Sequence, residues 1–251
     1  MKEKAFKVIG IVLSIAIFFG ANTVYVKFFG HPIYKYHLIK MAEKYIEETY
    51  SGTDYKTNGA YIRYGEEKLI VEVISPSQED VKFGVYCDFF GAKGDTYEAD
   101  VLSGKTASER ATWQYSNWCS AFAREGKHEY KVEETSGFLT VTENKAEKGA
   151  MFMGDFERNV EFDFVKVGER GGHLQIVLYS DLLTVEELCN ALLSVKASAN
   201  EYGLGFYTIT CRMVSSLNEN YYISVTKFLN EDIKDDEEFR LKVVETSIAY
   251  T

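Results

Sequence analysis

The sequence predicts an α+β protein: an N-terminal transmembrane helix, followed by two small α+β domains whose mainly antiparallel sheets are packed by helices. Three observations predict this class. Residues 8–26 carry no charge, several later segments alternate apolar and polar residues as strands do, and others repeat apolar residues at helical spacing. We expect a cytoplasmic tip and transmembrane anchor at residues 1–30, a first domain (α-β-β-β-α) at 31–130 and a second domain at 131–251.

The apolar run at residues 8–26 has the length of a membrane span. At about 1.5 Å per residue it forms a helix of roughly 28 Å, close to a hydrocarbon core of about 30 Å. Ala21 and Thr23 make a poor signal-peptidase site, and aromatic residues follow them as at a membrane interface. We expect the run to stay in the lipid bilayer. The alternative is a cleaved signal peptide, which would leave a secreted soluble domain.

Charge predicts the orientation and excludes one class of partner. Lys2, Lys4 and Lys7 precede the span, so the positive-inside rule predicts a cytoplasmic N-terminus, with the domains outside the cell membrane. The net charge is −10, and because residues 1–30 carry +3, the remaining chain carries −13. Nucleic-acid binding requires a basic face, so we expect no nucleic-acid partner.

In the first domain, Pro32 is expected to open a helix that ends near Gly52. Thr106 and Glu109 have capping-box spacing for a second helix that runs to about Gly126. A polar linker, EGKHEYKVEETSG, then separates the domains. Strands are predicted at AYIRY, KLIVEVIS and VKFGVYCDFF, with a short extended piece at DTYEADV.

In the second domain, Thr184 is expected to cap a helix that ends at Gly203. A terminal helix, capped by Asp235 or Asp236, is expected to run to about Tyr250. Strands are predicted at FLTVT, NVEFDFVKV, HLQIVLYS, GFYTITCRMV and YYISVTKFL.

Three stretches carry a family resemblance. The anchor followed by HPIYKYHLIKMAEKYIEETYSG, and later DLLTVEELCNALLSVKASANEYGLGFYTIT with TKFLNEDI, resembles the uncharacterised YfjL-like proteins of Gram-positive bacteria. The resemblance implies a single-pass protein of the cell envelope. It carries no catalytic residue to transfer.

The cysteines at positions 87, 119, 189 and 211 lie far apart and form no CxxC pair, which disfavours zinc and thioredoxin-type centres. Each lies on an apolar face, typical of a small buried side chain. By standard helix and strand rises, Cys189 and Cys211 each lie about 20 Å from the turn between them. We therefore expect a close thiol pair, which could form a disulfide in an oxidising exterior.

No catalytic, cofactor-binding or metal site is predicted, since HExxH, GxSxG, GxGxxG and the phosphate loop are absent. The histidines at positions 31, 37, 128 and 173 are scattered. The acidic run at residues 230–238 could attract calcium, but it lacks EF-hand spacing, and capping of the last helix accounts for it better.

Four aromatic residues could form a platform that stacks on sugars: Trp113, Tyr115, Trp118 and Phe122. Trp118 and Phe122 share the predicted core face of their helix, so only Trp113 departs from the buried stripe.

These features predict a membrane-tethered extracytoplasmic protein that acts as a non-enzymatic binding module of the cell envelope. Its partner would be another envelope protein or a wall polymer, and no cofactor is expected. The alternative is an envelope hydrolase with a site assembled from distant segments. A pocket where a histidine or cysteine meets a carboxylate would favour the enzyme, whereas exposed apolar surface would favour binding.

Overall fold

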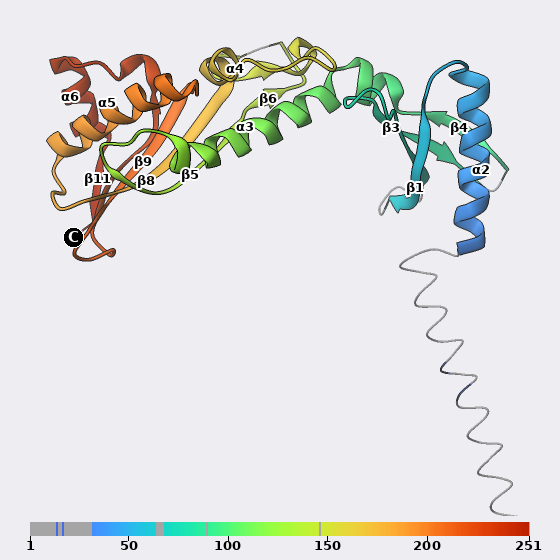
Figure 1. Cartoon of the computed structure of the whole chain (residues 1–251), viewed down its shortest axis with the longest axis horizontal. Coiled ribbons are helices and arrows are strands. Elements are labelled where there is room, and N and C mark those ends of the chain that lie inside the picture. Colours follow the sequence, from blue (N-terminus) through green and yellow to red (C-terminus); the bar gives the residue numbers. More distant parts are fainter. Residues whose placement is uncertain are drawn as a thin grey trace, which may run out of the picture. The chain divides into compact units, whose positions relative to one another are not determined.

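A computed structural model of the chain describes residues 14, 17, 32–63, 68–88, 90–145 and 147–250 (Figure 1). Apart from Ser14 and Ile17, the predicted span at residues 8–26 lies outside the described residues. Among the described helices, none combines the length and apolar character needed to cross a membrane. The described chain is α+β, as predicted, and divides into two compact units, residues 1–102 and 103–251.

The first unit packs one helix on a four-stranded antiparallel sheet in the order β1-β2-β3-β4. Its elements are α2 (Pro32–Thr49), β1 (Lys56–Arg63), β2 (Lys68–Ile74), β3 (Lys82–Cys87), β4 (Ala92–Asp95) and a π-helical turn η1 (Glu98–Leu102). Leu38, Ala42 and Ile46 recur every four residues on α2, and all three are buried. They join Val71 and Val85 of the sheet in one hydrophobic core.

The second unit contains a five-stranded mixed sheet and its helices. Its elements are α3 (Lys105–Glu125), β5 (Lys131–Leu139), β6 (Val141–Thr142), β7 (Met151–Phe152), η2 (Met153–Asp155), α4 (Phe164–Gly171), β8 (Gly172–Ser180), α5 (Val185–Tyr202), β9 (Thr208–Ser215), β10 (Tyr222–Leu229), η3 (Asn230–Asp232), α6 (Glu237–Thr246) and β11 (Ile248–Tyr250). The sheet has the order β11-β10-β9-β8-β5, and β6 and β7 form a separate parallel pair.

Within this sheet, β8 and β9 pair in parallel, whereas the other neighbours are antiparallel. A parallel pair needs a long crossover connection, which α5 supplies. Leu174, Ile176 and Leu178 alternate along β8, and all three are buried in one core with side chains of α3, α5 and α6. The helices therefore cover the face of the sheet on which these residues lie (Figure 1).

Two predicted helix caps are confirmed. The hydroxyl of Thr184 accepts a hydrogen bond from the backbone N–H of Glu187 at 3.1 Å, and Gly203, at φ 79°, ends the same helix. At α6, the carboxylate of Asp236 accepts from the N–H of Phe239 at 2.8 Å.

The predicted capping role of Thr106 is wrong. Helix α3 begins at Lys105, so Thr106 already lies inside its first turn. The N-cap residue is Gly104, at φ 85°, a conformation that favours glycine, and it has no side chain with which to cap.

Helix α3 packs in the second unit, whereas the sequence analysis placed it in a first domain ending at residue 130. Its residues Tyr115 and Cys119 are buried in the core of the second unit. The hydroxyl of Thr135 on β5 donates to the carbonyl oxygen of Cys119, and Gly137 leaves room for the Cys119 thiol. The stretch expected to be a linker therefore contains the start of β5, an edge strand whose charges resemble those of a loop.

Two further predictions are corrected. NVEFDFVKV was expected to be a strand, but α4 begins within it, because the Asp163 carboxylate accepts from the N–H groups of Val165 and Lys166 at 3.1 and 3.2 Å. The terminal helix ends at Thr246 instead of Tyr250, and β11 follows it and pairs with β10.

A close backbone approach holds α4 against the start of β9. A Cβ atom at Gly168 would overlap the carbonyl oxygen of Gly205, and a Cβ at Gly205 would overlap the carbonyl oxygen of Val165. The Gly205 N–H donates to the carbonyl oxygen of Phe164 at 3.2 Å, and the Tyr115 hydroxyl donates to the Gly205 carbonyl at 2.8 Å. Gly205 thus forms hydrogen bonds with both α3 and α4.

We expect Gly168→Ala to destabilise the protein by about 1–3 kcal/mol, because the new methyl group must displace backbone. Helix propensity alone would give the opposite sign, since alanine is favoured over glycine by up to about 1 kcal/mol in a helix. Thermal unfolding of the full chain in detergent measures the change. Glu169→Ala, an exposed change on the same helix, is the control and should have little effect. A Gly168→Ala protein as stable as the parent would contradict the close approach.

Candidate functional site

The four cysteines are all buried, and none is paired in a disulfide in the structure. Burial raises the pKa of Cys119 and of Cys211 to about 12 and that of Cys87 to about 11, and it also raises the pKa of Cys189. At neutral pH they are therefore thiols, which are poor nucleophiles and metal ligands. Cys189 and Cys211 belong to the same core, and their expected proximity stays a prediction.

Of the three described histidines, His37 is exposed on α2, whereas His128 and His173 are held by structural contacts. His128 Nε2 lies 2.7 Å from the carbonyl oxygen of Phe122, and His173 Nε2 lies 3.2 Å from the hydroxyl of Thr210. Burial and the charge of Lys227 lower the pKa of His173, which keeps its ring neutral. In the part of the chain that the structure describes, no group of three or more His, Cys, Asp or Glu residues could hold a metal ion.

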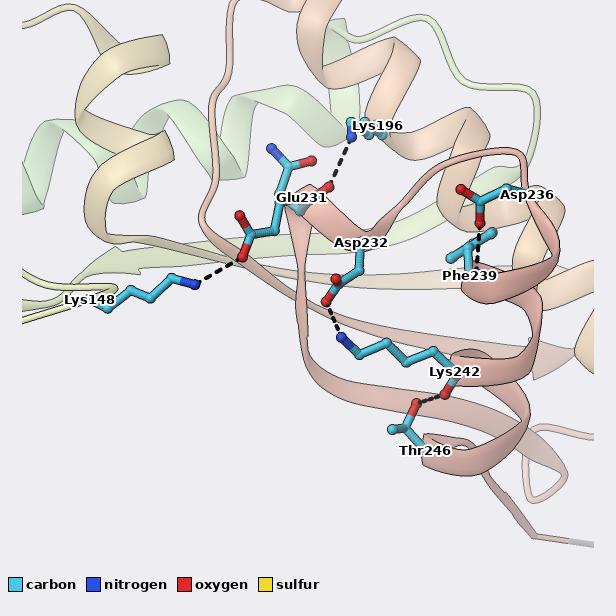
Figure 2. Close-up of polar contacts among 9 residues, drawn as sticks. Lys148, Lys196, Glu231, Asp232, Asp236, Phe239, Lys242 and Thr246 are labelled. Carbon is cyan, nitrogen blue, oxygen red and sulfur yellow. Dashed lines mark hydrogen bonds and ion pairs between the residues drawn. The ribbon is translucent and has the colours of Figure 1, made fainter.

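The acidic run at residues 230–238 is engaged in local contacts (Figure 2). Besides the cap formed by Asp236, the carboxylate of Asp232 pairs with Lys242, and Glu231 pairs with Lys148 at 3.0 Å. These contacts support the expectation that the acidic residues cap the last helix, in preference to binding calcium. They also pair with lysines around the preceding turn.

Lys196 fixes the turn at the start of the run (Figure 2). Its Nζ donates to the carbonyl oxygens of Asn230 and Ile233 at 2.9 and 2.8 Å, and burial lowers its pKa. This lysine satisfies main-chain acceptors that the short turn leaves free.

A groove of about 670 Å³ lies along α3 in the second unit. Trp113, Asn117 and Arg124 share one face of α3 by their spacing. Most of the residues that α3 contributes to the lining of the groove are aromatic, amide or charged: Trp113, Gln114, Asn117, Trp118, Arg124 and Glu125. The chain leading into α4 contributes Glu161, Phe162 and Phe164.

Trp118 is a fixed part of this groove. Its ring stacks on Phe164, with centroids 5.6 Å apart and planes at 25°, and on Tyr202, with centroids 4.9 Å apart and planes at 30°. Its indole Nε1 is buried and has no hydrogen-bond partner among the described residues. An unpaired buried donor costs about 1–3 kcal/mol, which the stacking must offset.

Trp113 is the exposed part of the groove. Its side chain is 65 % exposed, which is unusual for so large an apolar ring. Nearby, the guanidinium of Arg110 lies over the ring of Phe162, 4.3 Å from its centroid, and donates to the carbonyl oxygen of Val160. The groove thus combines one exposed indole with rings that are already packed.

Polar groups at the groove are partly oriented by neighbours. The hydroxyl of Tyr202 donates to Glu125 Oε2 at 3.0 Å, and burial together with this bond raises the pKa of Tyr202 to about 12. Gln114, Asn117 and Glu161 add amide and carboxylate groups to the lining. The arrangement offers ring stacking together with both donors and acceptors.

The four aromatic residues that could have formed a platform are therefore divided between the groove and the core. Trp113 and Trp118 line the groove, whereas Tyr115 and Phe122 are fully buried in the core. The rings of Phe162 and Phe164 were not predicted to belong to a site, because the alternation of apolar residues in their segment is typical of a strand.

The first unit has a hollow of about 650 Å³ at the end of α2, lined by Glu43, Glu47, Tyr50 and Tyr55 among others. The tyrosine hydroxyls of this hollow already form hydrogen bonds within the first unit. The hydroxyl of Tyr50 donates to Asp95 at 2.8 Å, and the hydroxyl of Tyr55 donates to that of Tyr97 at 3.3 Å. We therefore regard the groove of the second unit as the better candidate.

Comparisons of the chain with protein-family models, curated proteins and solved structures gave no significant match. The resemblance to YfjL-like proteins stays a prediction.

We expect thiol reagents at neutral pH to leave the folded protein unmodified, because burial keeps its thiols protonated and covered. Denaturation without reductant should expose all four cysteines. Ser216→Cys, at an exposed position, is the control and should react in the folded protein. The measurement is mass spectrometry after alkylation. Two alkylated cysteines in the denatured chain, instead of four, would reveal a disulfide.

Proposed function

We propose that the protein is a membrane-tethered, extracytoplasmic and non-enzymatic binding module of the cell envelope, and that its ligand is a wall polymer. Residues 8–26 anchor it in the lipid bilayer, with the N-terminus in the cytoplasm. The groove along α3 is the ligand site. The observation that carries this proposal is the presence of an exposed indole beside packed rings and polar groups in one hollow.

The lining of the groove supports binding more than catalysis. It contains neither a cysteine nor a histidine nor a serine that could act as a nucleophile with a neighbouring base. The thiols of the chain are buried, and His128 and His173 contact a main-chain carbonyl and threonine hydroxyls. These features support a module that holds its ligand without converting it.

The lining also favours a polymer over a globular protein partner. Stable protein interfaces bury about 800 Å² on each partner, around an apolar centre with few charges. Here polar and charged groups lie among the rings, and the lining includes Glu125 and Glu161, a residue type that is depleted in protein interfaces. A narrow chain of polar rings can contact both kinds of group within one hollow.

We expect Trp113→Ala to lower binding of the full chain to isolated cell-wall fragments by roughly tenfold or more, as for other exposed aromatic anchors. The assay measures the protein that sediments with the fragments in detergent solution. Tyr221→Ala removes another exposed aromatic side chain of the same unit, 46 % exposed, and should bind like the parent.

Equal sedimentation of the parent and of Trp113→Ala would contradict the groove as the site. Release of soluble sugar fragments by the parent would instead support the envelope hydrolase. Carboxylates such as Glu125 and Glu161 would then be the first groups to replace.

The proposed topology makes a separate prediction. In intact cells stripped of their wall, a reporter fused after residue 251 should be degraded by added protease, because the domains lie outside. A reporter fused before residue 1 should be protected and serves as the control. A protected C-terminal reporter would contradict the envelope location.

A further inference from the structure

We infer that the groove binds a glycan through the uncharged faces and hydroxyl groups of its sugar rings, and not through phosphate or other anionic groups of the polymer. This inference rests on the proposed function. It concerns which chemical part of a wall polymer the groove contacts.

Charge is the first argument. The lining holds Arg124 against Glu125 and Glu161, so it has no surplus of positive charge. A further cation of α3, Arg110, already covers the ring of Phe162 and donates to a main-chain oxygen. Since the chain beyond residue 30 carries −13, it offers no general surplus of positive charge that would attract a polyanion to the groove.

Stacking is the second argument. A pyranose ring presents C–H groups on its faces, and these pack well on an exposed indole. Trp113 supplies such a ring at 65 % exposure. Trp118 is held between Phe164 and Tyr202, so it loses little further freedom when a ligand binds.

Hydrogen bonding is the third argument. The amides of Gln114 and Asn117 each offer donors and an acceptor, and the carboxylate of Glu161 offers acceptors. A hydroxyl group can both donate and accept, so a sugar can pair with all of them. A purely apolar ligand would leave these groups unpaired.

The test uses cell-wall fragments before and after hydrofluoric acid, which cleaves phosphodiesters and removes phosphate-linked polymers. We expect the full chain to sediment with both preparations to within about twofold, and sodium chloride to have a similarly small effect. Trp113→Ala should lose binding to both preparations, and Tyr221→Ala should keep it.

Fluorescence locates the contact. The two tryptophans of the chain both line the groove, so its intrinsic emission reports on this hollow. Soluble glycan released by muramidase from acid-treated fragments should change the emission in a saturable way. The phosphate polymer released by the acid should not.

Three outcomes separate the failures. Binding to untreated fragments that is lost after acid treatment would overturn the glycan inference and leave the proposed wall binding intact. Absence of binding to either preparation would overturn the proposed function itself. Saturable binding of the soluble glycan with no change in emission would place its site outside the groove, and would also overturn the inference.

Discussion

The backbone contact between Gly168 and Gly205 is the constraint on which the groove depends. Only residues without a Cβ atom allow α4 to come this close to the chain entering β9. The same Gly205 binds the carbonyl of Phe164 and accepts from Tyr115, whose pKa is raised by burial, so its hydroxyl stays a donor. Because Phe164 stacks on Trp118, this contact sets the position of both rings.

The groove therefore has a rigid part and a free part. Trp118 is packed between two aromatic rings, whereas Trp113 lies on the surface of α3. A packed ring has little conformational entropy left to lose on binding, and an exposed ring gains most from being covered. This division explains why Trp113 is the side chain whose removal should affect binding most and stability least.

The sequence predicted those helix ends that are set by contacts between residues close together in the chain. The Thr184 cap and the Gly203 stop were readable because each acts within a few residues. The helix α4 was missed because apolar residues at 160, 162 and 164 alternate as in a strand, and the Asp163 cap was read as part of that alternation. The assignment of α3 to the second unit depends on long-range packing on β5, which no local pattern shows. The groove was not predicted from the sequence, because its lining joins α3 to the separate segment that leads into α4.

On the proposed function, tethering explains how a shallow site could suffice. A groove with one exposed indole and no deep cavity offers few strong contacts, so each individual binding event should be weak. On this proposal, an anchor at residues 8–26 would confine the protein to the membrane surface, beneath the polymer it is proposed to bind. A polymer repeats its binding unit many times, so the local concentration of sites stays high. High affinity per site is then unnecessary, and reversible contact allows the protein to release and rebind along the polymer.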